Sequence, residues 1–312
     1  MKEKILKFLF NSKKVVSGVT ISEQLGISRV AVWKHIKSFK ESGIKIDSTS
    51  RGYFLPFKDD LLFPFCFEKF QDKIHFSPTV VTTMNSAKKL ARAGADDFSV
   101  VTALNQTSGR GRLNRKWISS HGGLWFTLIL KPDLPIHLAH TLNFAASYSL
   151  AQCLNNLFDL DAKVKWPNDI LIKNKKLAGL LSEMETEGDM LKFVNIGIGL
   201  NVNNNPEKDI PDSISLKNII GKHGPRRKIL ILFLSIFKEL YGKINDQTLT
   251  GRDIISMWKK HTSTIGNHVY IETFGEKYRG IATDVDSTGA LLLKTHAGQT
   301  KKIIYGDCFY RD

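Results

Sequence analysis

Residues 108–117 read SGRGRLNRKW, and the interpretation of the rest of the chain depends on this stretch. Arg110, Arg112, Arg115 and Lys116 place four cations in seven residues beside glycines, which suits neither a helix nor a strand core. Glycine lets main-chain N–H groups approach a ligand, and guanidinium groups bind phosphate or carboxylate through paired hydrogen bonds. The stretch therefore predicts an anion-binding loop that a ligand orders. The alternative is a solvated basic surface loop.

Hydrophobic segments on both sides attach this loop to a sheet. Residues 100–106 precede it and residues 124–131 follow it, each apolar at nearly every position, as in buried strands. The other elements predicted in this region are strands over 79–83, 162–166 and 193–203, helices over 84–94 and 142–157, and a hairpin of 170–172 with 176–183. These segments predict a central domain over residues 70–262.

Polar residues follow or precede several of these strands. Thr82 and Thr83 lie where a strand meets a helix, and they bind a ligand or cap the helix. Asn168 and Asp169 follow Pro167, where they form a turn, coordinate Mg²⁺ or accept a proton. Asn201 ends a strand whose glycines allow a ligand to approach closely. The sequence thus predicts a pocket walled by one sheet.

The net charge of +15 favours an anionic partner, which could be nucleic acid, a nucleotide or an acidic protein. Much of this charge lies in residues 1–58, which hold twelve Lys and Arg against four Asp and Glu. No apolar segment approaches the ~20 residues of a membrane span, and the N-terminus lacks a signal-peptide pattern, so we expect a cytoplasmic protein. Three scattered cysteines fit neither a disulfide framework nor a zinc site.

Residues 1–60 predict a winged helix-turn-helix. A helix over 2–10 precedes a short helix capped by Thr20, with Glu23 three residues on, and Gly26 supplies the turn. The second helix of the motif begins after Ser28, and strands over 44–47 and 52–55 form a wing. The predicted DNA contacts are exposed positions of the recognition helix and the wing: Ser28, Arg29, Trp33, Lys34, Lys37 and Arg51. The alternative is a helical bundle that mediates dimerisation.

Residues 263–312 predict a small β-barrel of four short strands, over 267–273, 277–285, 290–294 and 299–305, with glycines at their turns. The whole chain is therefore predicted to be an α+β protein of three domains.

Four blocks in this order and spacing, GRGRLNRKW, KWPNDI, KLAGLL and NIGIGLNVN, together with the N-terminal module, resemble the biotin protein ligases that double as biotin operon repressors. The resemblance spans essentially the whole chain. It implies a mixed α/β ligase domain of the class II synthetase-like type and an SH3-like C-terminal domain. It also implies two reactions: biotin and MgATP give biotinyl-5′-AMP, and a lysine of a biotin carboxyl carrier protein then takes the biotin.

The resemblance also implies roles for individual residues. Biotin and its adenylate would contact Thr82, Thr83, Met84, Gln106, Arg110, Gly111, Arg112 and Lys176. ATP would contact Arg115, Trp117, Asn168 and Asn201, with Asn168 or Asp169 near Mg²⁺. Lys176 and Arg112 would neutralise charge during adenylation, and Asp169 would help to deprotonate the acceptor lysine. Thr82-Thr83-Met84 stands where the family usually has Ser-Thr-Asn, so either one side-chain amide is missing or the register shifts and Asn85 supplies it. Residues 221–228 are either basic surface or near the cover of the adenylate.

Three functions remain open at this stage. The first is a ligase and repressor in which the adenylate is the corepressor of a homodimer on operator DNA. The second is a ligase without regulation, and the third is a lipoate ligase, for which the GRGR loop and the winged helix are not expected. A regulator with an inactive sensor domain is disfavoured, because every charged position that adenylation requires is present.

Overall fold

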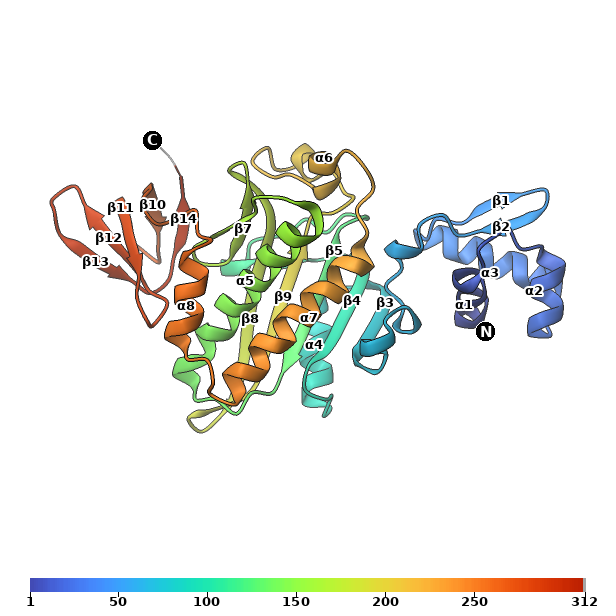
Figure 1. The fold of residues 1–312 in the computed structure, drawn as a ribbon, viewed down its shortest axis with the longest axis horizontal. Helices are drawn as coiled ribbons and strands as arrows, with labels where there is room; N and C mark the ends of the chain where they lie inside the picture. The colour runs from blue at the N-terminus through green and yellow to red at the C-terminus, as the bar shows by residue number, and fades with distance from the viewer. Residues whose placement is uncertain (311–312) are drawn as a thin grey trace.

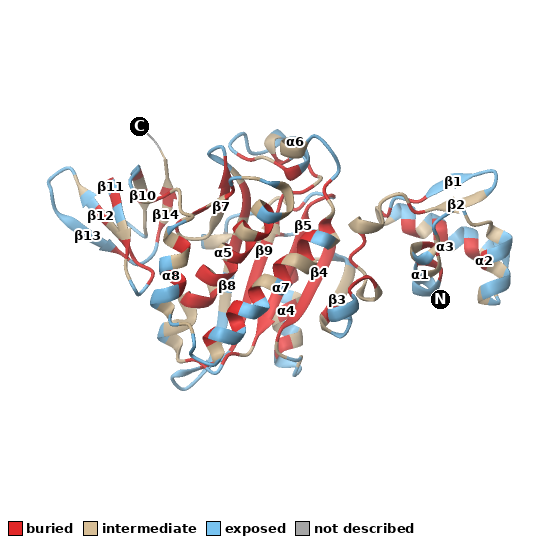
Figure 2. Ribbon diagram, viewed as in Figure 1, coloured by how far each residue is buried: buried red, intermediate tan, exposed pale blue. Residues whose placement is uncertain are grey.

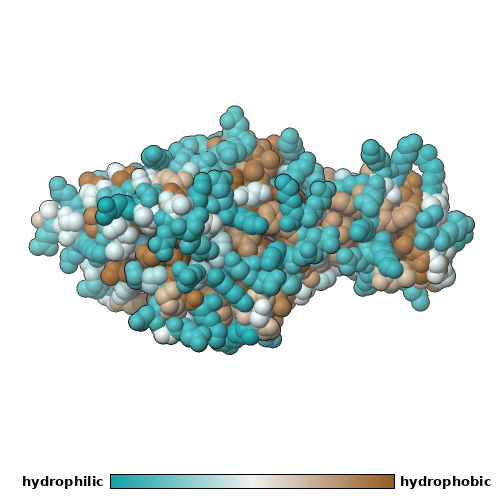
Figure 3. Space-filling model, turned by 60° about the horizontal axis from the view of Figure 1, so that its bottom comes forward, coloured by the Kyte–Doolittle hydropathy of each residue, from teal (hydrophilic) through white to brown (hydrophobic). Residues whose placement is uncertain are grey.

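The computed structural model describes residues 1–310 and has three units in a row (Figure 1). The helical module with the N-terminus lies at one end, a seven-stranded sheet with its helices lies in the middle, and a smaller sheet lies at the other end. A narrow waist separates the first unit from the second in the space-filling view (Figure 3). This order of units agrees with the predicted one.

Three helices and a wing form the N-terminal module. Their bounds are α1 (Lys2–Asn11), α2 (Gly18–Leu25), α3 (Arg29–Glu41), β1 (Asp47–Thr49) and β2 (Gly52–Phe54). Apolar residues at helical spacing, such as Leu6, Ile21 and Ile36, are buried in its core. Gly26 ends α2 with φ of 62°, and the Ser28 hydroxyl accepts a hydrogen bond that caps α3, both as predicted.

The start of α2 differs from the prediction. Val16 pairs with Tyr53 of the wing, which leaves Ser17 in an extended conformation before the helix. The Ser17 hydroxyl accepts from the Thr20 amide at 3.0 Å, so Ser17 is the cap and the predicted cap at Thr20 is wrong. A contact from the wing, distant in sequence, decided this boundary.

The wing is also shifted by a few residues. Its pairs are Asp47 with Phe54, Ser48 with Tyr53 and Thr49 with Gly52, so the first strand begins where the predicted one ended. Residues 44–46 precede the ladder because Ile44 and Ile46 are buried in the core of the module.

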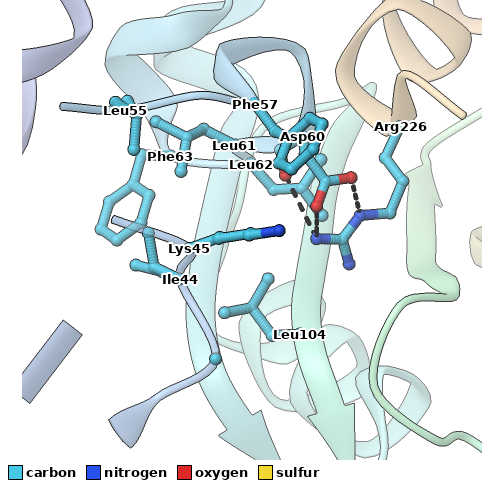
Figure 4. A pocket seen from close by; sticks show the side chains of 11 residues that line it. Ile44, Lys45, Leu55, Phe57, Asp60, Leu61, Leu62, Phe63, Leu104 and Arg226 are labelled. Atoms are coloured by element: carbon cyan, nitrogen blue, oxygen red, sulfur yellow. Dashed lines mark hydrogen bonds and ion pairs between the residues drawn. The ribbon is translucent and has the colours of Figure 1, made fainter. Parts of the chain in front are cut away.

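A linker of short 3₁₀ helices joins this module to the central domain: η1 (Lys58–Asp60), η2 (Pro64–Cys66) and η3 (Glu68–Lys73). The Asp60 carboxylate of η1 accepts two hydrogen bonds from Arg226, at 2.5 and 2.6 Å, and the Asp60 carbonyl accepts a third at 3.3 Å (Figure 4). Arg227 and Lys228 pair with Asp59. The basic segment 221–228 therefore largely anchors the linker of the N-terminal module to the central domain. Arg226 is not part of a basic surface, because only 2% of it is exposed.

The central sheet has the strand order β3-β4-β5-β9-β8-β7-β6, and only the β3–β4 pair is parallel. The bounds are β3 (Ile74–Val80), β4 (Ser99–Gln106), β5 (Leu124–Leu130), β6 (Lys163–Lys165), β7 (Asp169–Ile172), β8 (Lys175–Glu187) and β9 (Met190–Leu200). The strand predicted over 79–83 lies earlier, at β3, because Thr82 caps the helix that follows. The strand predicted over 193–203 begins and ends three residues earlier.

Helices cover both faces of this sheet. The bounds are α4 (Thr83–Arg92), α5 (Ala139–Phe158), α6 (Leu216–Ile220), α7 (Arg226–Asn245) and α8 (Gly251–Lys259), with 3₁₀ turns η4 (Arg112–Asn114), η5 (Ile136–Leu138) and η6 (Pro206–Lys208). Alternate residues of β9 enter different clusters: Phe193 packs with Ala87 of α4, whereas Val194 joins the core that holds α5 and α7. The strands between these layers are mostly buried (Figure 2).

The C-terminal sheet has the order β13-β12-β11-β10-β14 and is antiparallel throughout. Its bounds are β10 (His268–Glu272), β11 (Lys277–Val285), β12 (Leu291–Thr295), β13 (Thr300–Ile303) and β14 (Asp307–Phe309). The fifth strand, β14, was not predicted, because three residues give too short a pattern to recognise. Helix α8 was also missed, although Thr250 and Asp253 form a capping box that the sequence displays.

All three cysteines are buried, and burial raises the pKa of Cys66, Cys153 and Cys308 to about 12. They are therefore neutral thiols at physiological pH.

Candidate functional site

A cavity of about 880 Å³ opens beside β8 and β9, between residues 108–117 and the C-terminal sheet. It brings together most of the predicted site residues, which come from five separate segments. Those that line it are Thr82, Thr83, Met84, Gln106, Arg110, Gly111, Arg112, Arg115, Trp117, Asn168, Asp169 and Lys176. Its volume lies in the range of a pocket for a small molecule or cofactor.

Two glycines of β9 make room for the wall of the cavity. A side chain at Gly199 would begin 2.5 Å from Nε1 of Trp117, and one at Gly197 would begin 2.5 Å from Sδ of Met84. A third glycine, Gly179 of β8, lies against the same Trp117 ring. The glycines therefore admit Trp117 and Met84, which pack on the strands and face the cavity.

Two main-chain hydrogen bonds join the two ends of the arginine loop, residues 108–117. The Trp117 amide donates to the Gly109 carbonyl at 2.9 Å, and the Gly111 amide donates to the Arg115 carbonyl at 2.7 Å. Between these bonds lies the short turn η4, which the composition did not predict. Leu113 within this turn has φ of 52°, a left-handed backbone conformation that residues other than glycine seldom adopt.

The arginines of the loop form ion pairs with two parts of the protein, strand β8 and the C-terminal sheet. Arg110 pairs with Glu183 of β8 at 2.9 Å. Arg112 donates to the Gly306 carbonyl at 3.0 Å, and Arg115 lies 2.5 Å from Asp307. Burial lowers the pKa of Arg112, which Asp307 and Asp169 partly offset, yet the group stays charged because its ordinary value is so high. The loop is thus held between β8 and the C-terminal sheet.

Glu183, Gly306 and Asp307 were not among the predicted site residues. Asp307 comes from β14, and nothing in its local sequence distinguishes it from an ordinary surface carboxylate. Only the packing of the C-terminal sheet on the cavity brings it to Arg115.

Lys176 and Asp169 form a close ion pair, with Nζ 2.7 Å from Oδ1. The Lys176 ammonium also lies 5.3 Å from the centre of the Trp117 ring, which is within the range of a cation–π contact. The hairpin of β7 and β8, which was predicted, brings these two residues together, although their ion pair was not predicted. The site therefore holds a cation, a carboxylate and an aromatic face within reach of one ligand.

Asn201 is the one predicted ligand contact that does not line the cavity. It is 3% exposed, and its side-chain oxygen accepts from Nδ2 of Asn204 at 2.9 Å. Asn201 directly follows β9, and its side chain stabilises the loop after the strand through this hydrogen bond to Asn204.

The predicted DNA-binding residues are exposed and belong to α3, its N-cap and the wing. Arg29, Trp33, Lys34 and Lys37 of α3 are exposed, and Arg51 lies in the turn of the wing. Ser28 is exposed too, but its hydroxyl already accepts from the Ala31 amide at 3.1 Å. The module therefore offers three cations and an indole ring on the helix, and one further cation on the wing.

Three family models match the chain along its length. They are a helix-turn-helix domain over residues 2–54, the biotin/lipoate A/B protein ligase family over 77–203 and the biotin protein ligase C-terminal domain over 264–311. The bifunctional ligase/repressor BirA of Bacillus subtilis is 34% identical over 98% of this chain and 97% of its own length. The chain belongs to the biotin protein ligase family. The predicted family and three-part architecture are thereby confirmed.

Other members of the biotin protein ligase family agree with this assignment. BirA of Escherichia coli is 27% identical over 89% of this chain and 88% of its own length. The structure of the Aquifex aeolicus biotin protein ligase in complex with biotin and ATP superposes with a TM-score of 0.65 and 27% identity, and it covers 77% of this chain and 98% of that one. In the part of the present chain that the structure describes, every helix is too short or too polar to cross a bilayer.

Proposed function

We propose that this protein is an ATP-dependent biotin–protein ligase that also represses transcription when it holds the adenylate. The observation that carries the proposal is the similarity to the B. subtilis ligase/repressor over nearly the full length of both chains, N-terminal module included. In the first step, a biotin carboxylate oxygen attacks the α-phosphorus of ATP and pyrophosphate leaves. In the second, a lysine amine of a carrier protein attacks the acyl carbon and AMP leaves.

Adenylation builds negative charge on the α-phosphate, so cations that are already in position stabilise its transition state. Lys176 and Arg112 line the same cavity and are candidates for this role, with Arg110 and Gly111 on the biotin side. Arg115 and Trp117 are the candidates for ATP contacts. Thr82, Thr83, Met84 and Gln106 would form the biotin end of the cavity.

Mg²⁺ would neutralise phosphate charge in this reaction, and Mg²⁺ usually takes one or two protein oxygens beside those of its substrate. The neighbouring side chains of Asn168 and Asp169 fit that need. Asp169 would also accept a proton from the acceptor lysine in the second step, because its carboxylate faces the cavity beside Lys176. Release of Lys176 to the ligand would free Asp169 for this task.

Ligase activity is tested by incubating the protein with ATP, labelled biotin, labelled lipoate and a carrier domain. We expect pyrophosphate release and transfer of biotin alone. Lipoate is the informative competitor because the matched family model includes lipoate ligases. Transfer of lipoate in preference to biotin would overturn the substrate assignment.

For repression, we propose that the adenylate-bound protein forms a homodimer that sets two α3 helices on an operator with twofold symmetry. Arg29, Trp33, Lys34, Lys37 and Arg51 would contact the DNA, with Ser28 capping the recognition helix. A mobility shift assay on DNA upstream of biotin genes, with and without biotinyl-5′-AMP, tests this. A shift that does not depend on the adenylate would contradict the corepressor role.

The domain boundaries that go with this proposal are 1–60 for DNA binding, 70–262 for catalysis and 263–312 for the SH3-like C-terminal domain. We also propose a cytoplasmic location, because ATP, the carrier protein and operator DNA must meet in one compartment. Fractionation followed by immunoblotting checks the location.

A further inference from the structure

A continuous chain of hydrogen bonds runs beside the cavity and includes two residues without a role so far. The Thr127 hydroxyl donates to Oγ1 of Thr83 at 2.8 Å, and the Thr83 hydroxyl donates to Oε1 of Gln106 at 3.2 Å. Nε2 of Gln106 donates to Oγ of Ser119 at 2.8 Å, and Ser119 donates to the Trp117 carbonyl at 3.3 Å. The chain joins β5, α4, β4 and the exit of the arginine loop.

Its direction is fixed by groups that have only one possible role. The Thr83 amide can only donate, and it points at Oε1 of Gln106 from 2.7 Å, so the amide oxygen must face α4 and Nε2 must face Ser119. Ser119 therefore accepts, and its own proton goes to the Trp117 carbonyl, which can only accept. Since the Thr83 proton goes to Gln106, the remaining hydroxyl, that of Thr127, must be the donor to Thr83.

Burial makes these bonds consequential. Thr127 is fully buried, Thr83 is 3% exposed and Ser119 is 9% exposed. A buried polar group that loses its partner is left without water to replace it, so each link resists rearrangement. Oε1 of Gln106 already accepts two hydrogen bonds, which use both of its lone pairs. The only hydrogen-bonding capacity that Gln106 retains for a ligand is the second N–H of Nε2.

We propose that Ser119 and Thr127 are positioning residues for biotin binding: they hold the Gln106 amide so that it presents a donor, never an acceptor, to the cavity. The biotin atom that faces Gln106 is then a hydrogen-bond acceptor. The same chain of hydrogen bonds ends on the Trp117 carbonyl, so biotin bound at Gln106 also stabilises the C-terminal end of the arginine loop. This inference rests on the proposed ligase function, because it assigns biotin to this end of the cavity.

The first test is calorimetric titration of biotin into the full-length protein without ATP. Ser119→Ala removes the acceptor for Nε2, so the Gln106 amide is held only by the two hydrogen bonds at Oε1 and its N–H groups are less firmly placed. The dissociation constant for biotin is therefore expected to rise about tenfold, the scale of one hydrogen bond. The matched control is Ser120→Ala, at an exposed neighbouring serine whose side chain has no role in the chain. The control is expected to bind as the wild type does.

A second pair of variants covers the possibility that Ser119→Ala disturbs folding. Thr127→Val keeps the shape but deletes the donor, whereas Thr127→Ser keeps the donor. We expect a several-fold weaker biotin affinity for Thr127→Val and near wild-type affinity for Thr127→Ser. Equal loss in both variants would mean that Thr127 acts through packing, and it would overturn the proposal.

A double-mutant cycle separates positioning from general structure. In a Gln106→Met background, Ser119→Ala is expected to cause no further loss of biotin affinity, because the amide it positions is gone. Additive losses would refute the positioning role. Failure of the wild type to bind biotin would instead refute the proposed function, whereas wild-type binding with unchanged affinity in Ser119→Ala would refute only this inference.

Discussion

The central domain meets its two neighbours through junctions of different kinds. Toward the N-terminal module, the buried Arg226 forms a bidentate pair with the partly buried Asp60 (Figure 4). Neither residue lines the cavity of the candidate site. Toward the C-terminal sheet, Arg112 and Arg115 contact Gly306 and Asp307, and all but Gly306 line the cavity. The first junction is therefore a structural anchor, whereas the second shares its charges with the ligand.

This difference indicates how ligand binding should act. An anion in the cavity competes with Asp307 for Arg112 and Arg115, so the C-terminal contacts should respond to it directly. The N-terminal anchor should respond only through backbone, since Arg226 also donates to the Gly123 carbonyl at 3.0 Å, just beyond the arginine loop.

The largest expected effect is at the N-terminal anchor. Arg226→Ala leaves the Asp60 carboxylate without its bidentate partner, and loss of one member of a buried pair typically costs about 3 kcal/mol or more. Urea unfolding of the full-length protein measures this change. Lys228→Ala is the control, because its pair with Asp59 is more than half exposed on the lysine side, and we expect a loss below about 1 kcal/mol. Similar losses in both variants would remove the distinction between the anchor and an ordinary surface pair.

At the shared junction, Arg112→Ala and Lys176→Ala should impair catalysis far more than folding. We expect adenylation to fall by about 100-fold or more, since each removes a cation beside the developing charge. Pyrophosphate release measures the rate, and urea unfolding should change little. Lys175→Ala, at the exposed neighbour of Lys176, serves as the control. Normal pyrophosphate release in Arg112→Ala or Lys176→Ala would contradict the proposed roles.

The stability of the protein should also depend on pH through a residue near the C-terminal junction. Gly289, whose carbonyl accepts from the Trp166 indole at 3.0 Å, lies in a turn that Asp286 holds through Thr288 and Lys302. Burial raises the pKa of Asp286, but these hydrogen bonds outweigh it and lower the pKa to about 2.

Because the folded pKa lies below the ordinary value near 4, Asp286 contributes stability above pH 4 that is lost as pH falls toward 2. We expect Asp286→Asn to destabilise the protein by about 1 kcal/mol at pH 6 and by less at pH 3. Thermal unfolding at both values of pH measures the difference. A deficit that is the same at both would show that ionisation of Asp286 is not involved.

The smallest effect is expected for a substitution in the wing of the N-terminal module. Arg51→Ala should weaken DNA binding and reduce the slope of log affinity against log salt by about 1, with biotin transfer unchanged. A salt titration of the mobility shift measures the slope, and Lys243→Ala, on α7 of the central domain, is the control. Loss of both DNA binding and ligation in Arg51→Ala would indicate a folding defect.

Local sequence predicted most elements correctly, because their signals are local. The apolar runs of β4 and β5 and the helical spacing in α5 follow from burial, and Gly26 and Ser28 mark helix ends through their own backbone preferences. The errors arose where a distant contact set the boundary. Val16 pairs with the wing and moves the cap of α2 to Ser17, and β14 is too short to have a pattern of its own.

The candidate site divides in the same way. The arginine loop, Lys176 and Asp169 could be named from the sequence because their chemistry is concentrated in short motifs. Asp307, Ser119 and Thr127 could not, since each is a common residue type whose importance depends on what lies beside it. Asn201 shows the converse, because a motif residue at a strand end turned inward to Asn204.

The sequence by itself determined the order of the three units, the cationic loop and the family, because each depends on residues close together in the chain. Only the tertiary structure decided which charges face each other: Arg226 with Asp60 at the anchor, and Arg115 with Asp307 at the cavity. The physical reason is that an ion pair or a hydrogen bond acts over a few ångströms, and only folding brings residues distant in sequence within that range.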